Sequence, residues 1–168
     1  MGLFDITKGG LHNTEWSGTA ISLHGQELDF GGFAKGYFLR WLKQELAARD
    51  IENAFVSFGR SSIYAAGRRP QADAWNIGLE SPFDGSMVKE FELKDKSLST
   101  SGNTPLYSGH IVNPLTGKQI RSKALVCIVD EDPLEAEVLS TAAFAADGEQ
   151  FEALEQAFPE ASFERFEL

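Results

Sequence analysis

The stretch ALVCIVDEDPLEAEVLSTAAFAA, residues 124–146, combines a strand pattern and a helix start in one continuous segment. Residues 124–129 form a short, uninterrupted apolar run, which is typical of a buried strand. The helix start follows at once, because Asp132 is a good N-cap, Pro133 suits the first helical position and Glu135 the third. The sequence therefore predicts a buried strand followed by a helix that continues to the end of this stretch.

Outward from this stretch, the patterns predict two further helices and many short strands. The helices run from about Phe33 to Arg49 and from Glu149 to Phe158, with apolar residues at helical spacing. The further strands are expected at residues 18–23, 26–30, 54–58, 62–66, 75–79, 87–93, 97–100 and 109–112. Many short strands with three helices predict an α+β fold built on a largely antiparallel sheet.

The composition is that of one ordinary globular domain covering residues 1–168, with 42% hydrophobic and 24% charged residues. A net charge of −10 argues against nucleic-acid binding, which usually needs a basic patch. No apolar run is long enough to span a bilayer, and nothing near Met1 resembles a signal peptide. We therefore expect a cytoplasmic protein, or a periplasmic or membrane-anchored one if a leader was removed. The single cysteine, Cys127, is expected in the core.

The segment LDFGGFAKG, residues 28–36, is the strongest candidate for a ligand site. Two adjacent glycines allow the backbone to approach a ligand closely, and the helix that follows directs its free N–H groups at the same place. Lys35 adds a mobile cation in the first helical turn. The segment predicts a pyrophosphate cradle, with an ordinary tight turn as the alternative.

A candidate metal site lies on the helix that begins at Pro133. Glu137 and Thr141 are four residues apart and share one helix face. A carboxylate and a hydroxyl on one face suit Mg²⁺, which takes few protein ligands and keeps water or phosphate oxygens. The alternative is a pair of solvated surface residues.

Three other groups of residues are weaker candidates. His110, at the end of a predicted strand, suits a general base or a structural hydrogen bond. Residues 100–102 (TSG) form a predicted turn that could bind a small anion. Arg60 and the Arg68-Arg69 pair could meet a substrate phosphate or simply belong to a solvated loop.

The order of these segments along the chain resembles the ApbE family. The succession is GLFDIT, LDFGGFAKGY, FVSFGRSSIYAAG, WNIGL, LSTSGN, HIVNPLTG and EAEVLSTAAF, and it covers nearly all of residues 2–158. LDFGGFAKGY and HIVNPLTG are the most specific of these. The resemblance implies an ApbE-like, T-fold-like α+β domain.

The resemblance also implies an activity. Members of the family are FAD:protein FMN transferases, which bind FAD with Mg²⁺ and move FMN onto a threonine of a partner flavoprotein, or hydrolyse FAD to FMN and AMP. By motif, His110 is the expected base, and Glu137, Thr141 and the carbonyl of Gly32 are the expected metal ligands. The positions expected to contact the flavin nucleotide are Asp29, Gly31, Gly32, Lys35, Gly59, Thr100, Ser101, Gly102, Asn113 and Thr116.

Three departures from the family pattern leave a second function open. The chain lacks the family's N-terminal region, Glu137 stands where the family has aspartate, and Arg60 replaces the second glycine of a Gly-Gly pair. The segment between Asn103 and His110 is also short. The alternative to an active transferase is a degenerate flavin- or nucleotide-binding module. A homo-oligomer in which a second chain completes the site is a further expectation.

Overall fold

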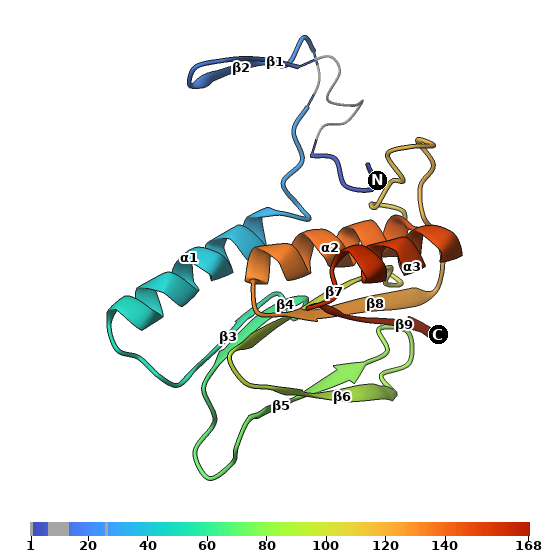
Figure 1. Ribbon diagram of the computed structural model, residues 1–168. Coiled ribbons are helices and arrows are strands. Elements are labelled where there is room, and N and C mark those ends of the chain that lie inside the picture. Colours follow the sequence, from blue (N-terminus) through green and yellow to red (C-terminus); the bar gives the residue numbers. More distant parts are fainter. Residues whose placement is uncertain (1, 7–13, 26) are drawn as a thin grey trace.

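The computed structural model describes residues 2–6, 14–25 and 27–168 (Figure 1). The described residues form three helices and nine strands, and the strands pair antiparallel throughout, so the α+β prediction is confirmed. The helices are α1 (Ala34–Ala48), α2 (Pro133–Ala145) and α3 (Gly148–Ala157). The strands are β1 (Glu15–Ser17), β2 (Ala20–Ser22), β3 (Ala54–Phe58), β4 (Ser62–Ala66), β5 (Trp75–Glu80), β6 (Met87–Leu93), β7 (Lys96–Gly102), β8 (Ala124–Asp130) and β9 (Ser162–Glu167).

The central sheet has five strands in the order β3-β4-β7-β8-β9. Helix α2 lies across one face of this sheet, and the β5–β6 hairpin lies near the other face (Figure 1). Strand β8 is therefore covered on both sides, which explains its uninterrupted apolar sequence. Val126 and Ile128 pack with α2, whereas Cys127 packs in the cluster formed with β6. Burial raises the pKa of the Cys127 thiol to about 11.

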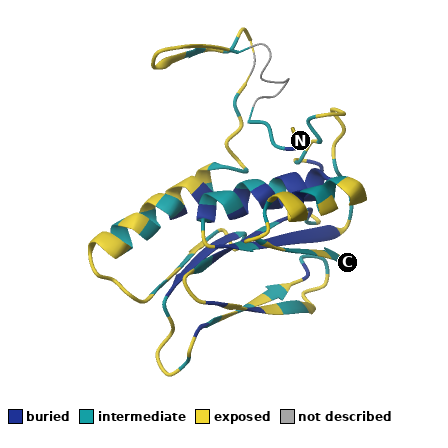
Figure 2. Cartoon of the chain, in the orientation of Figure 1, coloured by how far each residue is buried: buried dark blue, intermediate teal, exposed yellow. Residues whose placement is uncertain are grey.

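Helix α2 is the most buried helix of the described chain, as the dark blue ribbon in Figure 2 shows. Helix α2 begins at Pro133 with Asp132 as its N-cap, as the sequence predicts. The Asp132 side chain accepts hydrogen bonds from the backbone N–H groups of Leu134 (2.9 Å) and Glu135 (3.5 Å). Small residues such as Ala136 and Ala143 allow the helix to approach the sheet closely, and both are fully buried.

Helix α1 crosses α2 at a glycine. A Cβ atom at Gly36 would lie 2.6 Å from the Cβ of Glu137 and 2.6 Å from the carbonyl oxygen of Pro133. A second contact joins the same helices, since Arg40 Nε donates to Asp132 Oδ1 at 2.7 Å. The close crossing places the first turn of α1 beside the middle of α2.

Of the two strands predicted near the N-terminus, the one at residues 18–23 contains β2, whereas the one at residues 26–30 was wrong for its described residues. The first hairpin pairs residues 15–17 with residues 20–22, and its turn contains Gly18, whose φ is +59°. The predicted turn at His24-Gly25 therefore follows the hairpin instead of joining two strands. Residues 27–30 form no strand, and Gln26 lies outside the described residues.

Two predictions around residue 100 were also wrong. The predicted TSG turn belongs to β7, where residues 100–102 pair with residues 125–127 of β8. The predicted strand at 109–112 is a loop, in which only Val112 makes an isolated bridge, with Gln119. Gly109, with φ of +72°, redirects the chain at that point. Strand β9, at the edge of the sheet, was not predicted.

Candidate functional site

The candidate site begins at the glycine turn that precedes α1. Lys35, in the first turn of this helix, directs its ammonium back to the carbonyl oxygen of Gly31 at 3.1 Å. The same ammonium forms an ion pair with Glu137 Oε1 of α2. Gly31 and Lys35 therefore meet Glu137, which lies 102 positions after Lys35 in the chain.

Glu137 is buried, with only 3% of its surface exposed. A buried carboxylate needs hydrogen-bond donors, because water no longer solvates it. Oε1 pairs with Lys35, and Oε2 accepts hydrogen bonds from Ser62 Oγ of β4 and from Ser99 Oγ of β7, the latter at 3.0 Å. The carboxylate therefore joins two helices and two strands, and the alternative reading of Glu137 as a solvated surface residue was wrong.

A chain of hydroxyl groups continues from this carboxylate between the sheet and α2. Ser99 Oγ lies 2.9 Å from Ser140 Oγ, and Ser140 Oγ lies 2.9 Å from Ser101 Oγ. Ser101 Oγ then lies 3.4 Å from Thr141 Oγ1. Sequence reasoning missed Ser62, Ser99 and Ser140. The available signal was the alternation of serines along β7, because alternate residues of a strand point to the same face.

Gly32 lies against Thr141. A Cβ atom at Gly32 would be 2.7 Å from Thr141 Oγ1, so only glycine fits this position without a shift. The structure thus places Gly32 against Thr141, one turn of α2 from Glu137, so the three residues expected to hold a metal are neighbours. Thr141 Oγ1 also lies 3.3 Å from the carbonyl oxygen of Glu137.

The donors in this cluster are suited to one class of metal ion. They are a carboxylate, a hydroxyl and a backbone carbonyl, all hard oxygen ligands. Each carboxylate oxygen can accept about two hydrogen bonds, and Oε1 of Glu137 has one partner, Lys35, among the described residues. No group of three or more His, Cys, Asp or Glu side chains able to hold a metal occurs in that part of the chain. The cluster therefore fits a cation that needs few protein ligands, and it does not fit a zinc-type site.

His110 lies on the loop between β7 and β8. Its imidazole is exposed and stacks on the ring of Tyr107, with the ring centroids 4.1 Å apart. Partial burial lowers the pKa of His110 from its ordinary value, while the charge of Asp29 acts in the opposite direction. Asp29 itself accepts a hydrogen bond from the N–H of Gly31 at 2.8 Å. Asp29 therefore contacts the glycine turn by a hydrogen bond and also acts on His110 through its charge.

Asn113 holds the same loop in place. Its Oδ1 accepts from the N–H groups of Leu115 (2.9 Å) and Thr116 (3.1 Å), and its Nδ2 donates to the carbonyl of Ala145 at 3.0 Å. The expected turn at Asn113 and Thr116 is present, and it is attached to the end of α2. Thr116 lies in this turn, and no contact joins it to the Glu137 cluster.

The side chain of Thr100 points to the opposite face of the sheet, where its hydroxyl lies 3.4 Å from Cys127 Sγ. Gly102 packs against Leu125 of β8, which leaves no room for a Cβ atom there. Gly59 lies in the open turn between β3 and β4, and its neighbour Arg60 pairs with Glu80 at 3.0 Å. Among the strand and turn positions expected to contact the nucleotide, Ser101 is the one whose side chain joins the hydroxyl chain.

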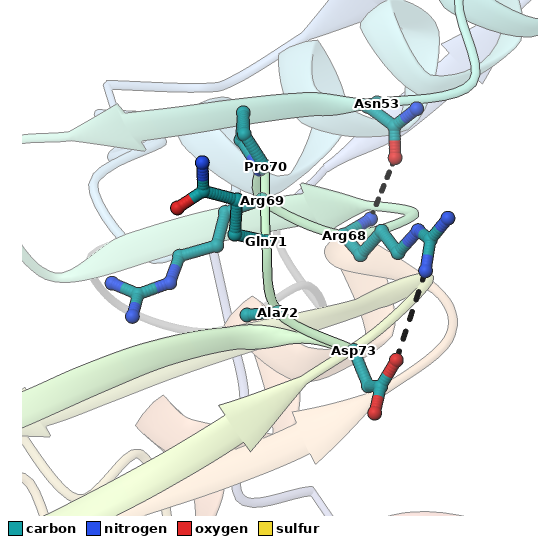
Figure 3. Close-up of a pocket in the computed structure, with 7 residues that line it drawn as sticks. All are labelled: Asn53, Arg68, Arg69, Pro70, Gln71, Ala72 and Asp73. Carbon is teal, nitrogen blue, oxygen red and sulfur yellow. Dashed lines mark hydrogen bonds and ion pairs between the residues drawn. The ribbon is translucent and has the colours of Figure 1, made fainter.

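The basic loop after β4 lies at the end of that strand opposite Ser62. It borders a hollow of about 470 Å³. In Figure 3, the guanidinium groups of Arg68 and Arg69 point to opposite sides of this loop, and that of Arg68 pairs with Asp73 at 3.7 Å. Asn53 Oδ1 fixes the loop by accepting from the N–H of Arg68 at 2.8 Å. The two arginines therefore do not converge on one anion.

No helix among the described residues is long and apolar enough to cross a membrane.

Similar proteins were found at the level of sequence. The chain is 26% identical over 130 residues to an FAD:protein FMN transferase of Klebsiella pneumoniae, an alignment that covers 71% of this chain and 39% of that protein. It is 28% identical over 153 residues to an FAD:protein FMN transferase of Treponema pallidum, covering 80% and 42% respectively. The chain thus spans about two fifths of the length of these curated relatives.

Solved structures share the fold. The ApbE protein of Thermotoga maritima superimposes with a TM-score of 0.75 at 27% identity, covering 92% of this chain and 54% of that one. The flavin transferase ApbE of Vibrio cholerae gives a TM-score of 0.75 at 24% identity, covering 94% and 56%. The flavinyl transferase ApbE of Pseudomonas stutzeri gives 0.72 at 26% identity, covering 92% and 51%. The model of the ApbE family matches residues 2–163, and the chain belongs to this family.

Proposed function

We propose that this chain forms the flavin-nucleotide site of a Mg²⁺-dependent FAD:protein FMN transferase. The observation that carries the proposal is the convergence of the Gly31-Gly32 turn, Lys35, Glu137 and Thr141 in one cluster. The two relatives named above carry this activity in their names. Because the chain spans less than half of their length, its activity is part of the proposal.

The diphosphate of FAD is expected to bind at the start of α1. The first turn of this helix contains no acidic residue, so its positive dipole end favours an anion. The N–H groups of Gly31 and Ala34 already donate to Asp29 and Phe30, so the helix dipole and Lys35 carry this expectation. Lys35 adds a cation that is one third exposed and can therefore reach a ligand. In a protein with a net charge of −10, this local positive potential matters for attracting an anionic substrate.

Glu137, Thr141 and the carbonyl of Gly32 are the residues that would hold the metal ion. When bound, Mg²⁺ supplies positive charge that stabilises the phosphate oxygens as the bond to the leaving group breaks. Ser62 and Ser99 fix the Glu137 carboxylate in its rotamer, so the ligand is preorganised by the sheet.

The transfer itself is a substitution at phosphorus. The hydroxyl oxygen of the acceptor attacks the phosphorus of the FMN half, the P–O bond to AMP breaks, and AMP leaves with the bridging oxygen. We expect His110 to take the hydroxyl proton, because partial burial lowers the pKa of its imidazole and so favours the neutral form that accepts a proton. If water replaces the acceptor, the same steps give FMN and AMP.

A second candidate function follows from the contacts of Glu137. Its carboxylate already has three protein partners, Lys35, Ser62 and Ser99, and these favour a structural role. In that case the chain is a flavin- or nucleotide-binding module without catalysis.

Incubation of the purified chain with FAD and Mg²⁺ distinguishes the two functions. Chromatography of the products should show AMP and FMN in equal amounts, and EDTA should abolish their formation. Glu137→Ala should remove the turnover, whereas Glu137→Asp should retain it because the carboxylate is kept. Binding of FAD without metal-dependent turnover would establish the module instead, and an active Glu137→Ala variant would contradict the metal role.

A further inference from the structure

The loop from Asn103 to Ser122 brings an aromatic ring onto the imidazole of His110. The rings of Tyr107 and His110 stack with an interplanar angle of 28° and a centroid distance of 4.1 Å. This stacking was not predicted from the sequence. It also involves a residue to which the ApbE resemblance gave no role.

The backbone of the loop imposes this stacking. Thr104 and Tyr107 exchange backbone hydrogen bonds of 2.9 and 3.2 Å, and Thr104 Oγ1 accepts a further bond of 3.0 Å from the N–H of Tyr107. Pro105 lies at the second position of this tight turn, where its fixed φ is favourable. The turn therefore fixes the direction in which the Tyr107 side chain leaves the backbone.

Asn103 and Gly109 fix the other side of the pair. Asn103 is 2% exposed, and its Oδ1 accepts from the N–H of Gly109 at 3.0 Å. Its Nδ2 donates to the carbonyl groups of Ile120 (3.1 Å) and Ser122 (2.9 Å). Gly109 has a φ of +72°, which turns the chain so that His110 returns beneath Tyr107. The two rings are thus held from both ends of the loop.

We infer that Tyr107 is a positioning residue for His110, holding its imidazole by stacking. This inference rests on the proposed function, in which His110 is the base. Without Tyr107, the imidazole of an exposed loop residue would turn freely about its side-chain bonds. A base that contributes 10²–10⁴-fold when positioned would then lose part of that contribution.

Charged groups also act on the imidazole. Asp29 raises the pKa of His110, while burial lowers it more strongly. Arg121 lies on the return segment of the loop, close to Gly109. Removal of the Tyr107 ring takes away part of the remaining burial of the imidazole, so the pKa of His110 should rise toward its ordinary value of about 6.5.

The test is an NMR titration of the histidine Cε1–Hε1 signals, which needs neither FAD nor turnover. The chain has three histidines, and His110→Gln identifies the signal of His110. In the parent protein, ring-current shielding by Tyr107 should displace this signal upfield. Tyr107→Ala should remove the displacement and raise the midpoint of the titration, whereas Tyr107→Phe should keep both as in the parent.

Leu106→Ala is the matched control, because Leu106 is 98% exposed on the same turn and its removal should leave the signal unchanged. If Tyr107→Ala also leaves the shift and the midpoint unchanged, the positioning role is overturned. In the transfer assay, Tyr107→Ala should lower turnover by roughly tenfold with unchanged FAD affinity. A parent protein without turnover that still shows the NMR changes would refute the proposed function and leave the stacking role standing.

Discussion

At the scale of single residues, Glu137 is the most constrained group of the site. It is almost fully buried, and its carboxylate accepts from a lysine and two serines that come from three different elements. Burial of a charge is costly unless donors replace the lost water, and here they do. We therefore expect a change at Glu137 to alter both the stability of the protein and its proposed activity.

Replacement of Glu137 by alanine should destabilise the protein by about 2 kcal/mol, because Ser62 and Ser99 would lose their acceptor and Lys35 its counterion. The loss is smaller than for a fully buried ion pair, since Lys35 is one third exposed and can turn to water. Urea unfolding followed by circular dichroism measures the difference. Glu155→Ala, at an exposed position of α3, is the control, and equal stability of the two variants would contradict this account.

At the scale of elements, the crossing of α1 and α2 creates the site. Gly36 allows the two helices to touch, and the contact places Lys35 opposite Glu137. Any change that separates the helices should therefore disturb the site as well as the core.

Gly36→Ala tests this contact. Alanine normally stabilises a helix by about 1 kcal/mol relative to glycine. Here the new Cβ would lie 2.6 Å from two atoms of α2, so we expect a net loss of about 2 kcal/mol from overpacking. Gly148→Ala, in the first turn of α3 and with nothing within 4 Å, should be neutral or stabilising. Urea unfolding of both variants gives the comparison, and a stabilised Gly36→Ala would rule out the close crossing.

Asp132 adds a pH-dependent contribution at the same crossing. Burial acts to raise the pKa of this carboxyl, but Arg40 and the N–H groups at the start of α2 outweigh it and lower the pKa. A lowered folded-state pKa stabilises the protein above the unfolded pKa of about 3.9, and this stabilisation is lost as pH falls through the folded value.

Asp132→Asn keeps the N-cap and removes the charge. The parent protein should therefore be more stable than this variant at pH 7, and the difference should be smaller at pH 3, because the contribution of the charge declines below the unfolded pKa. Unfolding by urea at the two pH values provides the measurement. A difference that is the same at both would show that the charge of Asp132 does not contribute.

At the scale of the whole molecule, the α+β class and most of the helices and strands were predictable, whereas the order of the strands and the face covered by α2 were not. The buried strand predicted from the apolar run of β8 and the helix start predicted at Asp132 are both confirmed, because both depend on local sequence. The buried serines were not predictable, because their environment depends on which strands pair and which face α2 covers. The stacking of Tyr107 on His110 was not predictable either, because it depends on a turn and on the positive φ of Gly109.

The chain covers about half of the length of the solved ApbE structures named above. The central claim is that the cluster around Glu137 is a flavin-nucleotide site. Lys35 is the residue on which that claim depends most, since its ammonium contacts both the carbonyl of Gly31 and the carboxylate of Glu137.

Titration calorimetry of FAD into the protein in the presence of Mg²⁺ tests the claim most directly. The control is Lys43→Met, because Lys43 lies on the same helix and donates to the carbonyl of Glu131 at 2.6 Å, away from the glycine turn. The account predicts saturable binding that Lys35→Met weakens at least roughly tenfold, as expected for the loss of a charge-assisted contact, and that Lys43→Met leaves unchanged. Absence of FAD binding to the parent protein, or equal affinity of the parent and Lys35→Met, would contradict it.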